Sequence, residues 1–126
     1  MIRRNKIVYW LPALAYMAAI FTISSFSLKV PQLKTGLDKI VHMAEYAILS
    51  FLLLYSFLKT TRMSRSKIEI TAIILTTLYG ISDEIHQYFV PLRECDLMDI
   101  LFDALGSFWI YLARLGKNNL NIKNKK

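Results

Sequence analysis

The sequence predicts an all-α integral membrane protein, a bundle of four transmembrane helices with both termini in the cytoplasm. Three observations predict this class. The 126 residues are 55% hydrophobic, with a mean hydropathy of +0.37, which leaves little polar sequence for the surface of a soluble domain. Uncharged stretches recur along the chain, and most of the basic residues lie in alternate gaps between them. The acidic residues are concentrated in the other gaps and in the adjoining helix ends.

Four stretches contain no charged residue, and each predicts one helix. They cover residues 7–28, 46–58, 70–82 and 104–113. Only the first is long enough by itself, since a spanning helix needs about 20 mostly apolar residues. The other three cross a membrane only if their polar flanks enter it. The predicted helices are about 7–26, 38–58, 68–88 and 97–115, forming one domain over residues 1–115, and the basic segment 116–126 is predicted to be a disordered cytoplasmic tail.

The first stretch could instead be a cleaved signal peptide, because basic residues precede it. Its apolar run is longer than the usual signal core, and residues 24–29 contain no Ala-x-Ala cleavage motif. These features favour an uncleaved helix.

The basic residues predict the orientation of the helices. Of 16 Lys and Arg residues, all but Lys29, Lys34, Lys39 and Arg93 fall in segments 3–6, 59–67 and 114–126. Basic residues concentrate on the cytoplasmic side of short loops, so these three segments face the cytoplasm. The formal charge of +7 does not indicate nucleic-acid binding, because the basic residues lie at helix ends and not on one surface with exposed aromatic side chains.

Eight of the nine acidic residues lie in residues 38–45 and 83–103, on the predicted outer side. A carboxylate at the middle of a bilayer costs roughly 2.5–3.5 kcal/mol unless it is paired or hydrated. Asp103 is the deepest, about 16 Å from the inner edge of a roughly 30 Å core at 1.5 Å per residue. This cost indicates a functional site.

Helical spacing places these polar residues on three faces that could meet. His86 projects away from them, and Ser24, Ser25, Gly80 and Gly106 are more typical of close helix packing. The predicted polar cluster comprises Asp38, Lys39, His42, Glu45, Tyr46, Asp83, Glu84, Gln87, Arg93, Asp99 and Asp103.

The cluster also raises the question of catalysis or metal binding. His42, Glu45 and Glu84 are the candidate acids and bases if the site is catalytic. The cluster offers nitrogen and oxygen ligands suited to Mg, Mn or Zn, but no established metal signature occurs, so no metal site or cofactor is predicted. Cys95 is the single cysteine, which excludes an internal disulfide.

Three motifs carry a resemblance to a known family. They are Asp38-Lys39-x-x-His42-x-x-Glu45-Tyr46, Asp83-Glu84-x-x-Gln87-x-Phe89-x-Pro91-x-Arg93, and Asp99-x-x-x-Asp103-x-x-Gly106. Together with Trp10-Leu11-Pro12 and residues 21–25, they resemble the VanZ-like family of small bacterial membrane proteins, over nearly all of residues 10–106. Leu92 stands where the family commonly has Gly, and Cys95 where small residues are usual.

The resemblance implies a multi-pass protein of the bacterial cytoplasmic membrane with a role in the cell envelope. The founding member is associated with low-level resistance to the glycopeptide antibiotic teicoplanin. The resemblance does not supply a reaction.

Several functions fit the predicted cluster. The favoured one is an outward-facing pocket for the head group of a membrane lipid, cell-wall precursor or lipoglycopeptide, with Arg93 binding its anionic part. A membrane-embedded enzyme acting on a lipid-linked substrate is the alternative. A transporter would need a homo-oligomer to enclose a path, and the one-sided carboxylates argue against it. A purely structural role in the envelope also remains open.

Overall fold

The computed structural model describes residues 5–26, 36–93 and 95–123, and side chains as far as residue 117. Within these residues the chain is helical and has no strand, so the predicted all-α class is confirmed. The elements are the 3₁₀ turn η1 (Lys6–Tyr9) and the helices α1 (Leu11–Ser24), α2 (Leu37–Thr60), α3 (Arg65–Tyr88), α4 (Leu97–Ser107) and α5 (Trp109–Lys123).

The first three helices follow the uncharged stretches closely. The predicted helix 7–26 is divided into η1 and α1, and Pro12 occupies the first turn of α1, where its missing N–H is not needed. Helices α2 and α3 have 24 residues each, or about 36 Å at 1.5 Å per residue. Each exceeds its predicted bounds by at most three residues at either end.

The structure corrects the prediction of a single fourth helix followed by a disordered tail. The helix breaks at Phe108, and α5 continues in a new direction to Lys123, so residues 116–123 are helical. Segment 109–123 contains no Pro, and its least favourable residue for a helix is Gly116, which costs about 1 kcal/mol. The α4 part has 11 residues, about 16 Å, which is roughly half of a hydrocarbon core.

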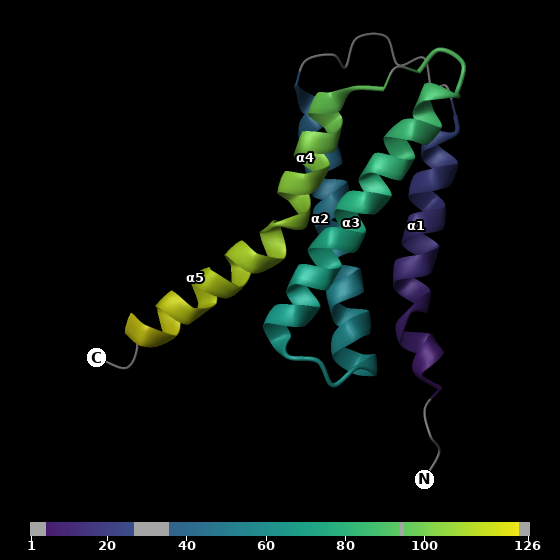
Figure 1. The fold of residues 1–126 in the computed structure, drawn as a ribbon. Coiled ribbons are helices and arrows are strands. Elements are labelled where there is room, and N and C mark those ends of the chain that lie inside the picture. The colour runs from purple at the N-terminus through teal and green to yellow at the C-terminus, as the bar shows by residue number, and fades with distance from the viewer. Residues whose placement is uncertain (1–4, 27–35, 94, 124–126) are drawn as a thin grey trace.

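Helices α1 to α4 run alternately up and down (Figure 1). Segment 61–64 and the start of η1 therefore lie at one end of the bundle. The last residues of α1 and α3 and the first residues of α2 and α4 lie at the opposite end, which we call the site end. Helix α2 contacts α1, α3 and α4, whereas most of α5 extends away from the bundle.

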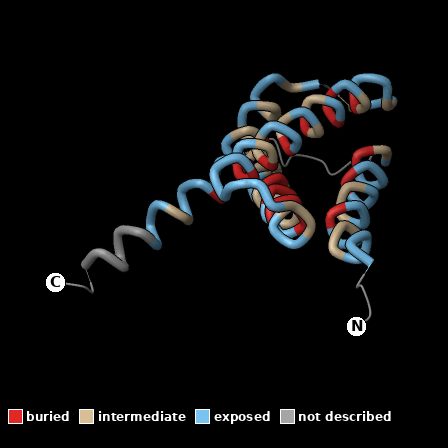
Figure 2. The backbone as a smooth tube through the Cα atoms, turned by 60° about the horizontal axis from the view of Figure 1, so that its bottom comes forward, coloured by how far each residue is buried: buried red, intermediate tan, exposed pale blue. Residues whose placement is uncertain are grey.

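The bundle has an unusual distribution of polar and apolar residues. Ten polar or charged side chains are buried among the described residues, against nine hydrophobic ones. Large apolar side chains are exposed on every α-helix, including Leu14, Phe51, Ile74, Leu101 and Leu112. Figure 2 shows buried residues facing inward on α1, α2 and α3 and exposed residues along α5. A soluble domain would show the opposite pattern.

Length and apolarity identify one helix among the described residues, α2, that can cross a membrane, and α1 is apolar but shorter. The remaining spans and the sides on which the termini lie stay predictions, in part because the basic residues before Asn5 and after Lys123 lie outside the described residues.

Candidate functional site

Two glycines let the helices approach closely at the site end. A Cβ at Gly106 of α4 would lie 3.0 Å from the carbonyl carbon of Met43 in α2. A Cβ at Gly80 of α3 would lie 2.9 Å from Asp103 Oδ2 and 3.1 Å from the Tyr46 ring. All three distances are shorter than ordinary contacts of about 3.5–4.0 Å, so the polar faces of α2, α3 and α4 meet because these positions carry no side chain.

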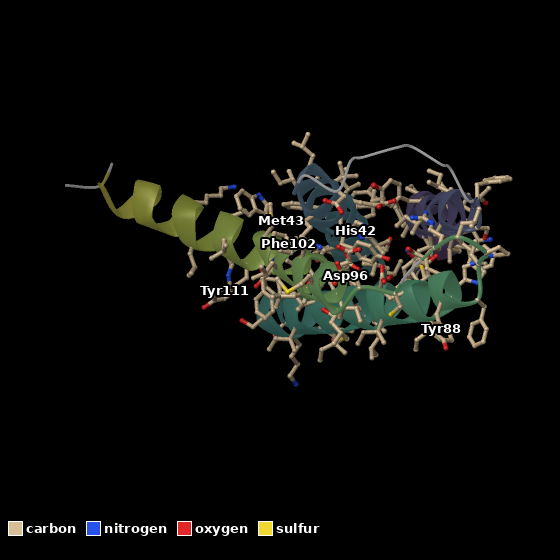
Figure 3. The ribbon with its side chains drawn as sticks, turned by 90° about the horizontal axis from the view of Figure 1, so that it is seen from above. His42, Met43, Tyr88, Asp96, Phe102 and Tyr111 are labelled. Carbon is tan, nitrogen blue, oxygen red and sulfur yellow. The ribbon has the colours of Figure 1, made fainter. Side chains whose placement is uncertain are left out.

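His42 is the centre of the site. Its Nδ1 lies 3.1 Å from Asp103 Oδ1, and its Nε2 lies 3.9 Å from Asp99 Oδ2. One donor atom from each of His42, Glu84 and Asp103 lies within 4.8 Å of the other two. We call these three residues the inner cluster. Figure 3 shows His42 and Asp96 where oxygen-bearing side chains gather, while Tyr88 points outward.

The two carboxylates of the inner cluster are buried and incompletely bonded. Glu84 is 0% exposed and Asp103 is 1% exposed. Glu84 Oε2 accepts the backbone N–H of Asp96 at 3.1 Å. Glu84 Oε1 and Asp103 Oδ2 have no hydrogen-bond partner among the described residues. A buried polar atom without a partner costs about 1–3 kcal/mol, and more if it is charged, so the described residues do not fully satisfy this part of the structure.

Lys39 is paired with two carboxylates above the inner cluster. Its Nζ donates to Asp96 Oδ2 at 2.8 Å and to Asp99 Oδ1 at 3.0 Å. Asp96 also caps α4 by accepting the N–H of Met98 at 2.8 Å. The Lys39 ammonium, and to a lesser extent the Met98 N–H, holds the pKa of Asp96 below its usual value. The single ammonium group of Lys39 therefore pairs with two carboxylates.

A cleft of about 450 Å³ opens at the site end, within the usual size range of a ligand site. Arg93 lines it but forms no ion pair with any described residue, and its Nε has no hydrogen-bond partner. Asp38 contributes a buried Oδ1 that is also unpartnered. The lining residues are Gly36, Asp38, Lys39, Gln87, Leu92, Arg93, Asp96 and Asp99.

Asp83 and Gln87 connect the site to α1. Ser24 Oγ donates to Asp83 Oδ1 at 2.6 Å, and Gln87 Nε2 donates to Asp83 Oδ2 at 2.8 Å. Both oxygens of Asp83 are therefore satisfied, which indicates a structural role. Glu45 lines a smaller cavity of about 40 Å³ beside them, which His42 and Arg93 also line.

Two further predicted positions lie at the edge of the site. Tyr46 is wholly buried against α3, and its hydroxyl has no hydrogen-bond partner in the described part of the chain. His86 lies apart from the inner cluster: its Nε2 is 2.9 Å from Ser25 Oγ, and Phe21 stacks on its ring at 4.4 Å. His86 thus joins α3 to α1, in agreement with its predicted direction away from the polar face.

Sequence reasoning missed two residues that the structure makes important. Asp96 was not included in the predicted cluster, although its N-cap position before α4 was a usable signal. Buried Glu69, at the other end, binds Arg65 Nε at 2.8 Å and Arg114 Nη1 at 3.1 Å. The i,i+4 spacing of Arg65 and Glu69 could have indicated the first of these pairs.

The fold and site define a class: a small all-α protein with an apolar exterior that gathers histidine, basic side chains and carboxylates at one end of its bundle. The family model described as VanZ/LLP1 matches residues 3–115. The chain therefore belongs to the VanZ/LLP1 family, as the three motifs indicated. No curated protein and no solved structure matches it.

Proposed function

We propose that the chain is a multi-pass membrane protein whose cleft binds the anionic head group of an amphiphile. Arg93, which forms no ion pair with a described residue, carries this proposal. Lys39 is committed to two carboxylates, whereas Arg93 has no such partner among the described residues. A planar guanidinium offers paired hydrogen bonds to phosphate or carboxylate, so Arg93 is suited to bind the anionic part of a ligand.

The membrane setting rests on the surface of the bundle. Apolar side chains such as Leu14, Phe51 and Ile74 are exposed on three different helices, and contiguous apolar surface of this kind suits lipid. Four spans with cytoplasmic termini would put the cleft at the outer face, where head groups lie. Membership of the VanZ/LLP1 family is consistent with a role in the bacterial cell envelope, including low-level resistance to teicoplanin-type glycopeptides.

The native cysteine tests the orientation. Cys95 is exposed at the site end, so a membrane-impermeant maleimide should label it in right-side-out vesicles. A Cys95→Ser/Ser64→Cys variant moves the thiol to the opposite end and should be labelled only in inside-out vesicles. Labelling of both proteins in the same vesicle type would refute the outward-facing cleft.

Binding tests the role of Arg93. Purified protein in a nonionic detergent is titrated with dihexanoyl-phosphatidic acid, and with the zwitterionic dihexanoyl-phosphatidylcholine for comparison. Arg93→Lys keeps the positive charge but loses the planar guanidinium that can donate two parallel hydrogen bonds. We therefore expect about tenfold weaker binding of the anionic lipid, corresponding to about 1.4 kcal/mol. Arg62→Lys, in the connection at the other end, is the matched control and should bind normally.

Equal affinity of Arg93→Lys and wild type for the anionic lipid would contradict the proposal. Cells that produce Arg93→Lys should be more susceptible to teicoplanin than cells that produce the wild-type protein at equal abundance. If only the cellular effect is missing, the head-group proposal stands and the link to glycopeptides fails.

A membrane-embedded enzyme is the second candidate, and the His42–Asp103 contact favours it. A carboxylate that holds one imidazole nitrogen orients the other toward a substrate. His42 and Arg93 line the same small cavity, so an anionic ester held by Arg93 could approach His42. Release of phosphate from a lipid phosphate by wild-type protein, abolished in His42→Gln, would support this function, and the absence of turnover on lipid phosphates and pyrophosphates would count against it.

A further inference from the structure

We infer that the inner cluster of His42, Glu84 and Asp103 binds a divalent cation. This site goes beyond the head-group cleft and does not depend on it. The three side chains come from three different helices, α2, α3 and α4. A bound ion would therefore connect the helices at the level where the polar faces meet.

The donor set has the composition of a transition-metal site. Neutral imidazole nitrogen and carboxylate oxygen are ligands for Zn²⁺ and Mn²⁺, at about 2.0–2.2 Å from the ion for zinc. Three donor atoms mutually within 4.8 Å can reach such distances with small side-chain rotations. Three protein ligands leave at least one coordination position open, which is the arrangement of catalytic and ligand-binding sites and not of closed structural ones.

The orphaned oxygens supply the second argument. Glu84 Oε1 and Asp103 Oδ2 belong to side chains that are 0% and 1% exposed, and neither oxygen has a hydrogen-bond partner among the described residues. Burial of such groups without a partner is costly. A cation coordinated by these oxygens would remove this cost.

The neighbouring cations cannot take this place. Lys39 Nζ is shared by Asp96 and Asp99, and Arg93 lines the cleft without forming an ion pair with either inner carboxylate. His42 brings at most one positive charge to two carboxylates. The local balance is therefore negative, as a divalent cation requires.

The surroundings hold the ligands in place. The Asp96 N–H fixes Glu84 Oε2, which leaves Oε1 for the ion. Gly80 makes room for Asp103 Oδ2, since a Cβ there would lie 2.9 Å from that oxygen. Such outer contacts commonly decide whether a metal site forms with the correct geometry.

The test uses the full chain without an affinity tag that binds metal, purified in detergent and treated with EDTA. MnCl₂, ZnCl₂ and MgCl₂ are added separately while the unfolding temperature is followed, and bound metal is counted by elemental analysis. We expect Mn²⁺ or Zn²⁺ to raise the unfolding temperature, to bind at one ion per chain, and for Mn²⁺ to give a bound-state electron paramagnetic resonance spectrum. Failure of all three cations to bind the wild-type chain would overturn the inference.

Variants locate the ion. Glu84→Gln and Asp103→Asn keep the shape of the side chains and should weaken binding at least tenfold. Glu69→Gln is the matched control, because it changes a buried acid at the other end of the bundle, and it should bind the metal as wild type does. Unchanged binding by both inner variants would also overturn the inference. Arg93→Lys should retain the metal whatever its effect on head groups, so the two proposals can fail separately.

Discussion

Replacement of Gly106 by Ala should force α4 away from α2 and disrupt the candidate site. The new Cβ would lie 3.0 Å from the carbonyl carbon of Met43 and 3.1 Å from its Cα, and closer still to its carbonyl oxygen. These are backbone atoms, so no side-chain rotation can relieve the clash. Restoring ordinary contact requires about 1 Å of separation between the two helices.

The cost of this change can be estimated from two effects. Overpacking against a rigid partner costs about 1–3 kcal/mol. The contact of His42 with Asp103, 3.1 Å long and one turn away, would be stretched beyond hydrogen-bonding distance, which forfeits about 1.5–3 kcal/mol for a bond to a charged group. The better helix propensity of Ala returns about 1 kcal/mol. We therefore expect a net loss of about 1.5–5 kcal/mol in unfolding free energy.

The assay is reversible unfolding of the purified protein in mixed detergent micelles, followed by tryptophan fluorescence. Gly116→Ala is the control, because nothing lies within 4 Å of a Cβ at that position of α5. It should stabilise the protein slightly, by about 0.5–1 kcal/mol. If Gly106→Ala were as stable as Gly116→Ala, the close approach of α2 and α4 would be refuted.

Three further changes have expected outcomes in the same unfolding assay. Leu92 is 76% exposed and has a φ of 68°, so Leu92→Gly should stabilise the protein by about 0.5 kcal/mol. The substitution relieves about 1–2 kcal/mol of left-handed backbone strain. This gain exceeds the roughly 0.4–1 kcal/mol that Gly costs by increasing the conformational entropy of the unfolded chain. Glu69→Gln should destabilise by about 2 kcal/mol through loss of its buried ion pairs and should speed tryptic cleavage after Arg114, which a tightly held α5 would resist; unchanged cleavage would count against the pairing. Asp96→Asn should lower the unfolding free energy at neutral pH, because Lys39 depresses the pKa of Asp96 in the folded state. The difference in unfolding free energy between wild type and Asp96→Asn should be complete at pH values above the usual pKa of 3.8 and should shrink as the pH falls below it. A difference that grows in acid would contradict the ion pair.

The sequence predicts the helices better than their pairings. Uncharged runs and polar spacing are local properties, so α2 and α3 and their polar faces could be recognised from residues 38–58 and 68–88 alone. Which polar groups bond is decided between helices: Asp83 is satisfied by Ser24 of α1, while Asp103 meets His42 of α2. No local pattern distinguishes these two carboxylates.

The break at Phe108 has the same kind of cause. Residues 97–115 look like one continuous helix, because nothing in them requires an interruption. The direction of α5 is consistent with a distant contact, in which Arg114 binds Glu69 at the other end of the bundle. Glu69 lies far from Arg114 in the sequence, so a helix boundary that depends on their contact cannot be read from residues 97–115 alone.

The two ends of the bundle handle buried carboxylates in opposite ways, and the difference bears on function. Glu69 is 1% exposed and is neutralised by two arginines, which shows that this fold can supply a buried acid with permanent cations. Glu84 and Asp103 are equally buried, yet neither forms an ion pair with a Lys or Arg among the described residues, and Arg93 nearby forms no ion pair with these residues either. If the acids at the site end served only to hold helices together, selection for stability would favour the solution used at Glu69. Within the described part of the chain, the inner cluster instead has carboxylates that lack a full set of partners, and the cleft has a cation that lacks an ion-pair partner. This is the arrangement that a binding site needs when a ligand or ion supplies the missing partners.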